Sequence, residues 1–208
     1  MGLAIGLMGV ASIVGLLLPA LDGGSPVTVV AGTAVGVLFP LATDRLLAGH
    51  DVHVGKLRGA GVRQSVLVFA VLFVHSVPEG MAMGTAYASG REGLGVFVIL
   101  AFALQNVPEG TSVAIPMAGA GFGGGAMLWA AVVTSAPQPI TAPLAYLAVE
   151  EVSALLPFSF AFAAGAMLSL VAAKLVPDAF GRTTWRSAAP GTVIAAALML
   201  ALSALLGV

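Results

Sequence analysis

The chain has 208 residues, of which 59% are hydrophobic and only 8% are charged, and its mean hydropathy is +1.07. Soluble domains carry about 25% charged residues, so this composition excludes a water-soluble globule and indicates a membrane protein. The net charge of −1 supplies no basic footprint for nucleic acid. Cysteine is absent, which excludes disulfides, thiolate metal sites and cysteine nucleophiles. Three histidines and nine acidic residues must therefore carry any chemistry.

Several apolar segments are long enough to cross a bilayer, which takes about 20 mostly apolar residues. They are apolar on all sides, whereas strands of an outer-membrane barrel would alternate with a period of two. The sequence therefore predicts an all-α, polytopic transmembrane helix bundle of about seven spans, forming one domain over residues 1–208. The predicted spans lie near 1–20, 27–47, 65–88, 93–118, 126–148, 154–176 and 189–207.

The distribution of basic residues predicts which loops face the cytoplasm. The side with the 48–64 and 177–188 loops carries Lys56, Arg58, Arg63, Arg182 and Arg186. The opposite side carries only Arg91. We therefore expect the 48–64 loop and the N-terminus to be cytoplasmic and the C-terminus to lie outside. No cleavable signal peptide is predicted, because the chain opens directly into an apolar run without a basic n-region.

Two related hexapeptides lie 30 residues apart in the third and fourth spans: His75-Ser-Val-Pro-Glu-Gly80 and Gln105-Asn-Val-Pro-Glu-Gly110. Each places a glutamate inside an apolar helix, where an ionisable group costs about 2.5–3.5 kcal/mol on insertion scales. Such a group is expected to face a bundle interior, a partner or a water-filled path. In each hexapeptide the first residue and the glutamate are four apart, so both lie on one helix face.

If the two helices face each other, one imidazole, two carboxylates and one amide oxygen converge: His75, Glu79, Gln105 and Glu109. Two carboxylates in a low dielectric repel each other, and a dication removes that conflict. This set of donors suits Zn²⁺, Fe²⁺ or Mn²⁺, and the lack of thiolates argues against Cu(I). A lone intramembrane histidine is more often a hydrogen-bonding group between helices, and Pro-Gly is often only a kink. Their repetition with the same spacing favours a metal site.

The paired hexapeptides resemble the fourth and fifth helices of the ZIP (Zrt/Irt-like) family of divalent metal transporters. Leu41-Ala-Thr-Asp-Arg-Leu-Leu47, followed by Gly49-His50-Asp51-Val-His53, is similar to the end of that family's third helix and its histidine-bearing cytoplasmic loop. Pro157-Phe-Ser-Phe-Ala-Phe-Ala-Ala-Gly-Ala-Met-Leu168 resembles its seventh helix. The resemblance implies eight helices, transport of zinc or related cations toward the cytosol, and commonly a homodimer with an elevator-like or alternating-access mechanism.

By this resemblance, residue 1 corresponds to the start of the family's second helix. The orientation derived from the basic residues agrees with that alignment. Whether the shorter chain is native or a start-site truncation stays open. Members with a binuclear centre have an Asn, an Asp or Asn, and a Glu where this chain has Ser76, Asn106 and Gln138. Neutral amide and hydroxyl oxygens compensate a 2+ charge poorly in a low dielectric, so we predict a centre for a single metal ion.

Four further residues are candidates for the second site or for the ion pathway. Lys174 could stand in for a second cation by pairing with an acid, or could extend to the interface as lysines near helix ends do. Asp178 could be an exit ligand or an ordinary loop acid. His50 and His53 could relay exiting metal or be solvated loop residues.

We interpret the chain as a transporter and not an enzyme, with Zn²⁺ as the expected substrate and Fe²⁺, Mn²⁺ or Cd²⁺ as further possibilities. One alternative is a non-transporting, metal-sensing homologue, motivated by Ser76, Gln138 and the absent first helix. A second is an intramembrane metallohydrolase, against which the sequence has no His-Glu-x-x-His pair and leaves no general base. The expected partners are a divalent ion, the lipid bilayer and a second copy in a homodimer, without nucleic acid. The expected location is the plasma membrane of a prokaryotic cell.

Overall fold

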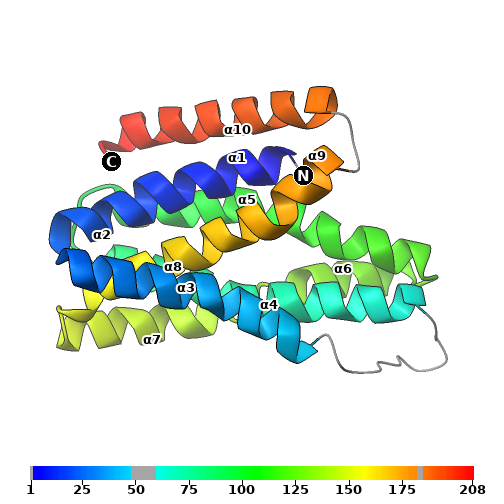
Figure 1. The fold of residues 1–208 in the computed structure, drawn as a ribbon, viewed down its shortest axis with the longest axis horizontal. Helices are drawn as coiled ribbons and strands as arrows, with labels where there is room; N and C mark the ends of the chain where they lie inside the picture. The colour runs from blue at the N-terminus through cyan, green and yellow to red at the C-terminus, as the bar shows by residue number, and fades with distance from the viewer. Residues whose placement is uncertain (1, 48–59, 182–184) are drawn as a thin grey trace.

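The computed structural model of the chain describes residues 2–47, 60–181 and 185–208, and within these ranges it is helical and contains no strand (Figure 1). The N-terminal half contains α1 (Gly2–Val10), the π-helix η1 (Ala11–Leu17), α2 (Leu18–Gly23), α3 (Pro26–Leu47) and α4 (Ala60–Ala88). The C-terminal half contains α5 (Leu94–Gly119), α6 (Gly124–Val133), α7 (Gln138–Glu151), α8 (Leu155–Leu170), the π-helix η2 (Val171–Leu175), α9 (Val176–Gly181) and α10 (Trp185–Leu206).

Six helical stretches of the described chain are long and apolar enough to cross a membrane: Gly2–Gly23, Pro26–Thr43, Gly61–Ala88, Leu94–Gly119, Leu155–Leu175 and Arg186–Leu206. The predicted all-α, polytopic bundle is therefore confirmed. Its outer surfaces carry exposed apolar side chains, among them Val27, Val193 and Leu205. Lipid can cover such side chains without cost, so the protein is an integral membrane protein.

The predicted span 126–148 is not one continuous helix. α6 ends at Val133, and α7 begins at Gln138 after a turn in which the Gln138 N–H bonds the Ser135 carbonyl at 3.1 Å. Proline at 137 and 139 removes two backbone donors at this point, which interrupts the helical hydrogen bonds. Proline is also favourable in the first turn of a helix, so the same residues that end one helix begin the next.

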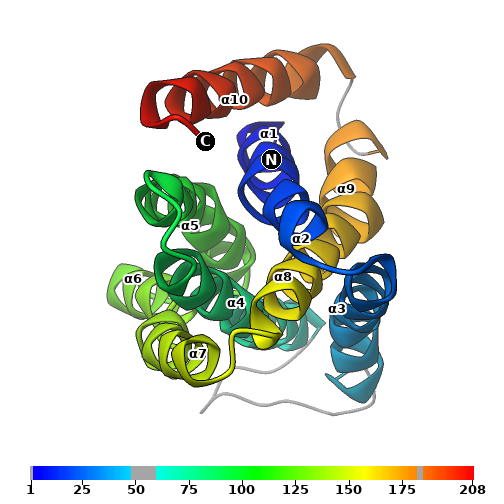
Figure 2. The ribbon, with the colours of Figure 1, turned by 90° about the vertical axis from the view of Figure 1, so that its left-hand side faces the viewer.

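Glycines allow the closest helix contacts of the bundle. α3 packs against α8, α4 against α7 and α1 against α10, and Figure 2 shows α10 beside α1 and α3 beside α8. A Cβ at Gly36 would lie 2.1 Å from the Phe162 carbonyl oxygen, and one at Gly84 would lie 2.0 Å from that of Ala142. Lipid supplies no hydrophobic force between helices, so small residues that let backbones approach provide the packing energy.

Two apolar clusters fill the interior. The larger includes Leu16, Phe97, Phe160 and Met167, from η1, α5 and α8. The smaller joins α4, α5 and α6 and contains Leu72, Val113, Met117 and Ala130. Leu72 lies one turn before His75, and Val113 lies one turn after Glu109, so the smaller cluster packs against the polar pairs of the two hexapeptides.

Candidate metal centre

The two hexapeptides meet in the interior, with His75 and Glu79 on α4 and Gln105 and Glu109 on α5. Glu79 and Gln105 are fully buried, His75 is 1% exposed and Glu109 is 9% exposed. One ligand atom from each of His75, Glu79 and Glu109 lies within 4.8 Å of the others. The structure thus brings together the residues that the sequence nominated as metal ligands.

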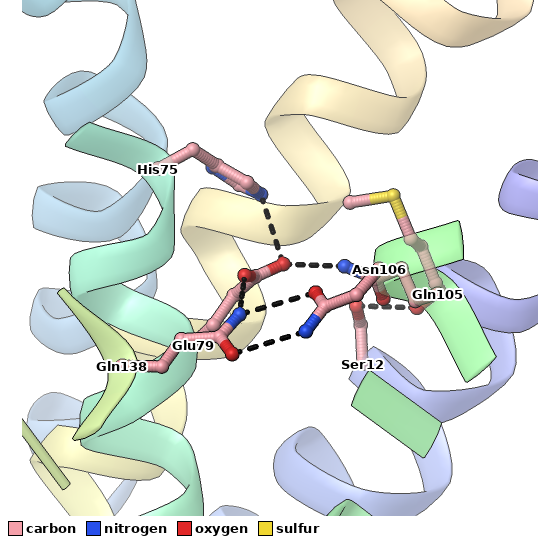
Figure 3. A network of polar contacts seen from close by, with 7 residues as sticks. Ser12, His75, Glu79, Gln105, Asn106 and Gln138 are labelled. Carbon is pink, nitrogen blue, oxygen red and sulfur yellow. Dashed lines mark hydrogen bonds and ion pairs between the residues drawn. The ribbon is translucent and has the colours of Figure 1, made fainter. Parts of the chain in front are cut away.

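Hydrogen bonds inside the cluster are unevenly distributed. Gln105 Nε2 donates to Glu79 Oε1, and His75 Nε2 lies 3.8 Å from the same oxygen (Figure 3). Among the described residues, five buried side-chain nitrogen or oxygen atoms have no hydrogen-bond partner, and four of them belong here. They are both ring nitrogens of His75, Oε1 of Gln105 and Oε1 of Glu109.

An unpartnered buried polar atom costs about 1–3 kcal/mol, and proteins rarely leave several in one place. The four atoms are two imidazole nitrogens and two oxygens, and imidazole nitrogen and side-chain oxygen are both ligand types for a borderline divalent cation. The two buried carboxylates also repel each other unless a positive charge lies between them. The donor set and its burial therefore fit a divalent metal ion.

The glycine that ends each hexapeptide determines what packs beside the glutamate. A Cβ at Gly80 would lie 2.0 Å from Thr141 Oγ1 on α7, and one at Gly110 would lie 3.2 Å from the Ala131 Cβ on α6. The two halves of the interrupted helix are thus each seated on one Pro-Glu-Gly turn. The matching positions of these glycines in the two hexapeptides are a sequence signal for this packing role.

Two of the predicted second-site residues also reach the centre. Gln138, 6% exposed at the start of α7, donates from Nε2 to Glu79 Oε2 at 2.7 Å and to Asn106 Oδ1 at 3.2 Å. Asn106 Nδ2 donates in return to Gln138 Oε1 at 3.1 Å. The third predicted residue, Ser76, is buried on α4 beside His75.

Of the remaining pathway candidates, the structure describes the side chain of Lys174 alone. Lys174 lies half-buried in η2. The side chain of Asp178, in α9, and the residues His50 and His53 lie outside the described residues. Of the two basic loops that predicted the orientation, residues 48–59 of the 48–64 loop and residues 182–184 of the 177–188 loop lie outside the described residues.

Two polar residues near this region were not singled out from the sequence. Thr141 on α7 donates to the Val77 carbonyl of α4 at 3.3 Å and to the Pro137 carbonyl at 2.9 Å. Ser12, buried at the start of η1, donates to the Met8 carbonyl at 2.6 Å (Figure 3). π-helical turns inside α-helices are frequent near functional sites.

Comparison with known proteins agrees with these observations. The family described as ZIP zinc transporter matches residues 45–208. The chain is 37% identical over 208 residues to a putative zinc transporter of Arabidopsis thaliana, covering 98% of this chain and 33% of that protein. It is 31% identical over 186 residues to the zinc transporter GufA of Myxococcus xanthus, covering 86% of this chain and 71% of that protein.

A third relative is the zinc transporter ZIPB of Bordetella bronchiseptica, 31% identical over 225 aligned residues, which cover 100% of this chain and 71% of that protein. The chain thus spans about a third of the length of the plant relative and most of the length of the two bacterial ones.

Proposed function

This chain belongs to the ZIP zinc transporter family, and on that premise we propose that it transports divalent metal cations, with Zn²⁺ as the main substrate, through the centre formed by His75, Glu79, Gln105 and Glu109. The observation that carries the proposal is the convergence of one imidazole and two carboxylates, with ligand atoms within 4.8 Å, inside a bundle of apolar helices. The relatives from Myxococcus xanthus and Bordetella bronchiseptica are zinc transporters, which supports zinc as the substrate.

The donor set favours passage over permanent retention. Zinc sites that only stabilise a fold are closed by four Cys or His ligands, whereas this centre offers one histidine and otherwise oxygen atoms. Conduction requires a site that binds well enough to admit the ion and weakly enough to release it. One imidazole with two carboxylates meets that requirement, because the carboxylates supply charge and the remaining positions stay exchangeable.

Binding also involves a rearrangement of Gln105. Its Nε2 donates to Glu79 Oε1, while its Oε1 has no partner. Only the oxygen of an amide can be a ligand, so a half-turn of this amide presents Oε1 to the ion and releases Glu79 Oε1 as a second ligand.

We further propose that transport runs toward the cytoplasm, with the basic 48–64 loop inside and the C-terminus outside. The proposed location is the plasma membrane of a prokaryotic cell, and the proposed assembly is a homodimer. Fe²⁺, Mn²⁺ and Cd²⁺ are further candidate substrates, because one nitrogen and several oxygens do not by themselves separate these ions.

The deciding experiment is ion flux into liposomes that contain the purified protein and an internal metal-sensitive dye, with Zn²⁺, Fe²⁺, Mn²⁺ and Cd²⁺ added in turn. We expect saturable Zn²⁺ uptake by the wild type and its loss in His75→Ala. Tight Zn²⁺ binding without flux would replace the transporter with the metal-sensing alternative. The absence of both Zn²⁺ binding and Zn²⁺ flux would overturn the proposal.

A further inference from the structure

Gln138 contacts the centre although it is not one of the four proposed ion ligands. Its Nε2 lies 2.7 Å from Glu79 Oε2 and 3.2 Å from Asn106 Oδ1, and its Oε1 accepts from Asn106 Nδ2 at 3.1 Å. The orientation of the Gln138 amide follows from its partner, because a carboxylate can only accept from it. The Asn106 amide is then oriented in turn by Gln138.

These bonds leave the two glutamates in different states. Glu79 accepts on both oxygens, from Gln105 at Oε1 and from Gln138 at Oε2, whereas Oε1 of Glu109 has no partner. Glu79 is therefore held at both of its oxygens, whereas Oε1 of Glu109 is not held. Hydrogen bonds to charged groups contribute about 1.5–3 kcal/mol each, so the contact from Gln138 is strong enough to decide how Glu79 points.

The interrupted helix is what places Gln138 there. The turn between α6 and α7 ends at this residue, and prolines flank it on both sides. Thr141, one turn later, bonds the α4 backbone at Val77, and Gly80 leaves no space between the two helices. The amide is thus held from a rigid helix start and not from a loop.

We propose that Gln138 is a positioning residue that clamps Glu79 and restricts the centre to one divalent ion; this rests on the proposed function. The Gln138 amide nitrogen occupies the point between Glu79 Oε2 and Asn106 Oδ1, two oxygens from different helices. A second dication at that point would have to displace the amide and would meet only one charged oxygen. Neutral amide oxygens compensate a 2+ charge poorly in a buried site.

The proposal predicts a gain of a site by a single change. Gln138→Glu exchanges the donor for a carboxylate, so the point between positions 79, 106 and 138 gains negative charge and loses its amide nitrogen. Three carboxylates would then share one buried region, and a second cation relieves their repulsion. Gln138→Leu removes the clamp without adding charge, and it frees Glu79 to turn.

The test is the number of Zn²⁺ ions bound per purified protomer, measured by equilibrium dialysis and elemental analysis. We expect one ion for the wild type, two for Gln138→Glu, and one for the control Gln64→Glu, the same exchange at an exposed position of α4. The double variant Gln138→Glu with Asn106→Leu should return toward one. A wild type that binds two ions, or a Gln138→Glu variant that binds one, overturns the inference while leaving the proposed function intact. A wild type that binds none overturns the proposed function itself.

Gln138→Leu gives a second, independent readout in the liposome assay. Loss of the clamp should raise KM for Zn²⁺ by about tenfold, corresponding to about 1.4 kcal/mol, and should change the maximal rate much less. A merely structural role would lower the maximal rate through loss of folded protein and leave KM unchanged. An unchanged KM in the folded variant would contradict the clamp.

Discussion

Gly80 on α4 and Thr141 on α7 approach so closely that a Cβ on the glycine would lie 2.0 Å from the threonine Oγ1. This contact is immediately beside Glu79, and it fixes the distance between the helix that carries the carboxylate and the helix that carries Gln138. The glycine of the first hexapeptide therefore acts on the centre through packing, without contributing a ligand.

Gly80→Ala should separate α4 from α7 and destabilise the protein. Overpacking of this kind costs about 1–3 kcal/mol, which corresponds to a melting temperature lower by roughly 5 °C for a protein of this size. The melting temperature of the detergent-solubilised protein and the rate of Zn²⁺ uptake should both fall. Gly119→Ala, where an added Cβ meets nothing within 4 Å, is the matched control and should leave both unchanged. Equal behaviour of the two variants would show that the close approach is unimportant.

Glu109→Gln should weaken Zn²⁺ binding by at least about 30-fold, because a buried charge–charge contact of about 2 kcal/mol or more is lost. The amide keeps the size of the side chain, so the folded protein should still reach the membrane. Isothermal titration with Zn²⁺ measures the change. The exposed Glu92 on the α4–α5 connection provides the control Glu92→Gln, which should bind as the wild type does. Wild-type affinity in Glu109→Gln would remove this carboxylate from the centre.

Gln105→His should shift the ion preference toward Zn²⁺ and away from Mn²⁺. An imidazole nitrogen suits zinc, whereas manganese prefers oxygen donors, so exchanging the only amide of the four for a ring nitrogen favours the softer ion. We expect the ratio of Zn²⁺ to Mn²⁺ transport in liposomes to rise by about tenfold, or about 1.4 kcal/mol. Gln64→His, at an exposed position, should leave the ratio as it is. An unchanged ratio in Gln105→His would mean that Gln105 is not a ligand.

Arg91→Ala should have little effect on stability. Arg91 Nη1 lies 3.2 Å from Asp22 Oδ2 and joins the α4–α5 connection to the end of α2, but the two side chains are 40% and 68% exposed. Exposed ion pairs contribute about 0–1 kcal/mol, so the melting temperature should fall by about 3 °C at most. Melting at low and high salt measures the contribution. A larger loss that salt abolishes would show that this pair holds the two helices together.

Much of the centre follows from the local sequence. A spacing of four residues puts His75 with Glu79, and Gln105 with Glu109, on one face of each helix, whatever the rest of the fold does. The cost of a glutamate in lipid then requires both faces to turn inward. These two local rules were enough to nominate all four residues that the structure brings together.

The interruption between α6 and α7 could not be predicted in the same way. The 126–148 segment has the apolar composition of a continuous span, and proline is tolerated inside membrane helices when neighbours satisfy the freed groups. Pro143 does lie within α7, whereas Pro137 and Pro139 flank the point where the helix begins. Only the packing of α7 against Gly80 and of α6 against Gly110 distinguishes the prolines that interrupt the span from the proline that does not.

The sequence by itself determined that this is a membrane protein made of apolar helices, and which four residues point inward from two of them, because both properties depend on composition and on contacts within one helix turn. The tertiary structure decided that Gln138 meets Glu79, which lies 59 residues earlier in the chain. That contact depends on how two glycines let a broken helix approach its neighbours. Long-range packing of this kind leaves no local pattern in the sequence. The sequence marks Gln138 only as a lost ligand for a second metal ion, whereas the structure shows that its amide also holds the carboxylate of Glu79.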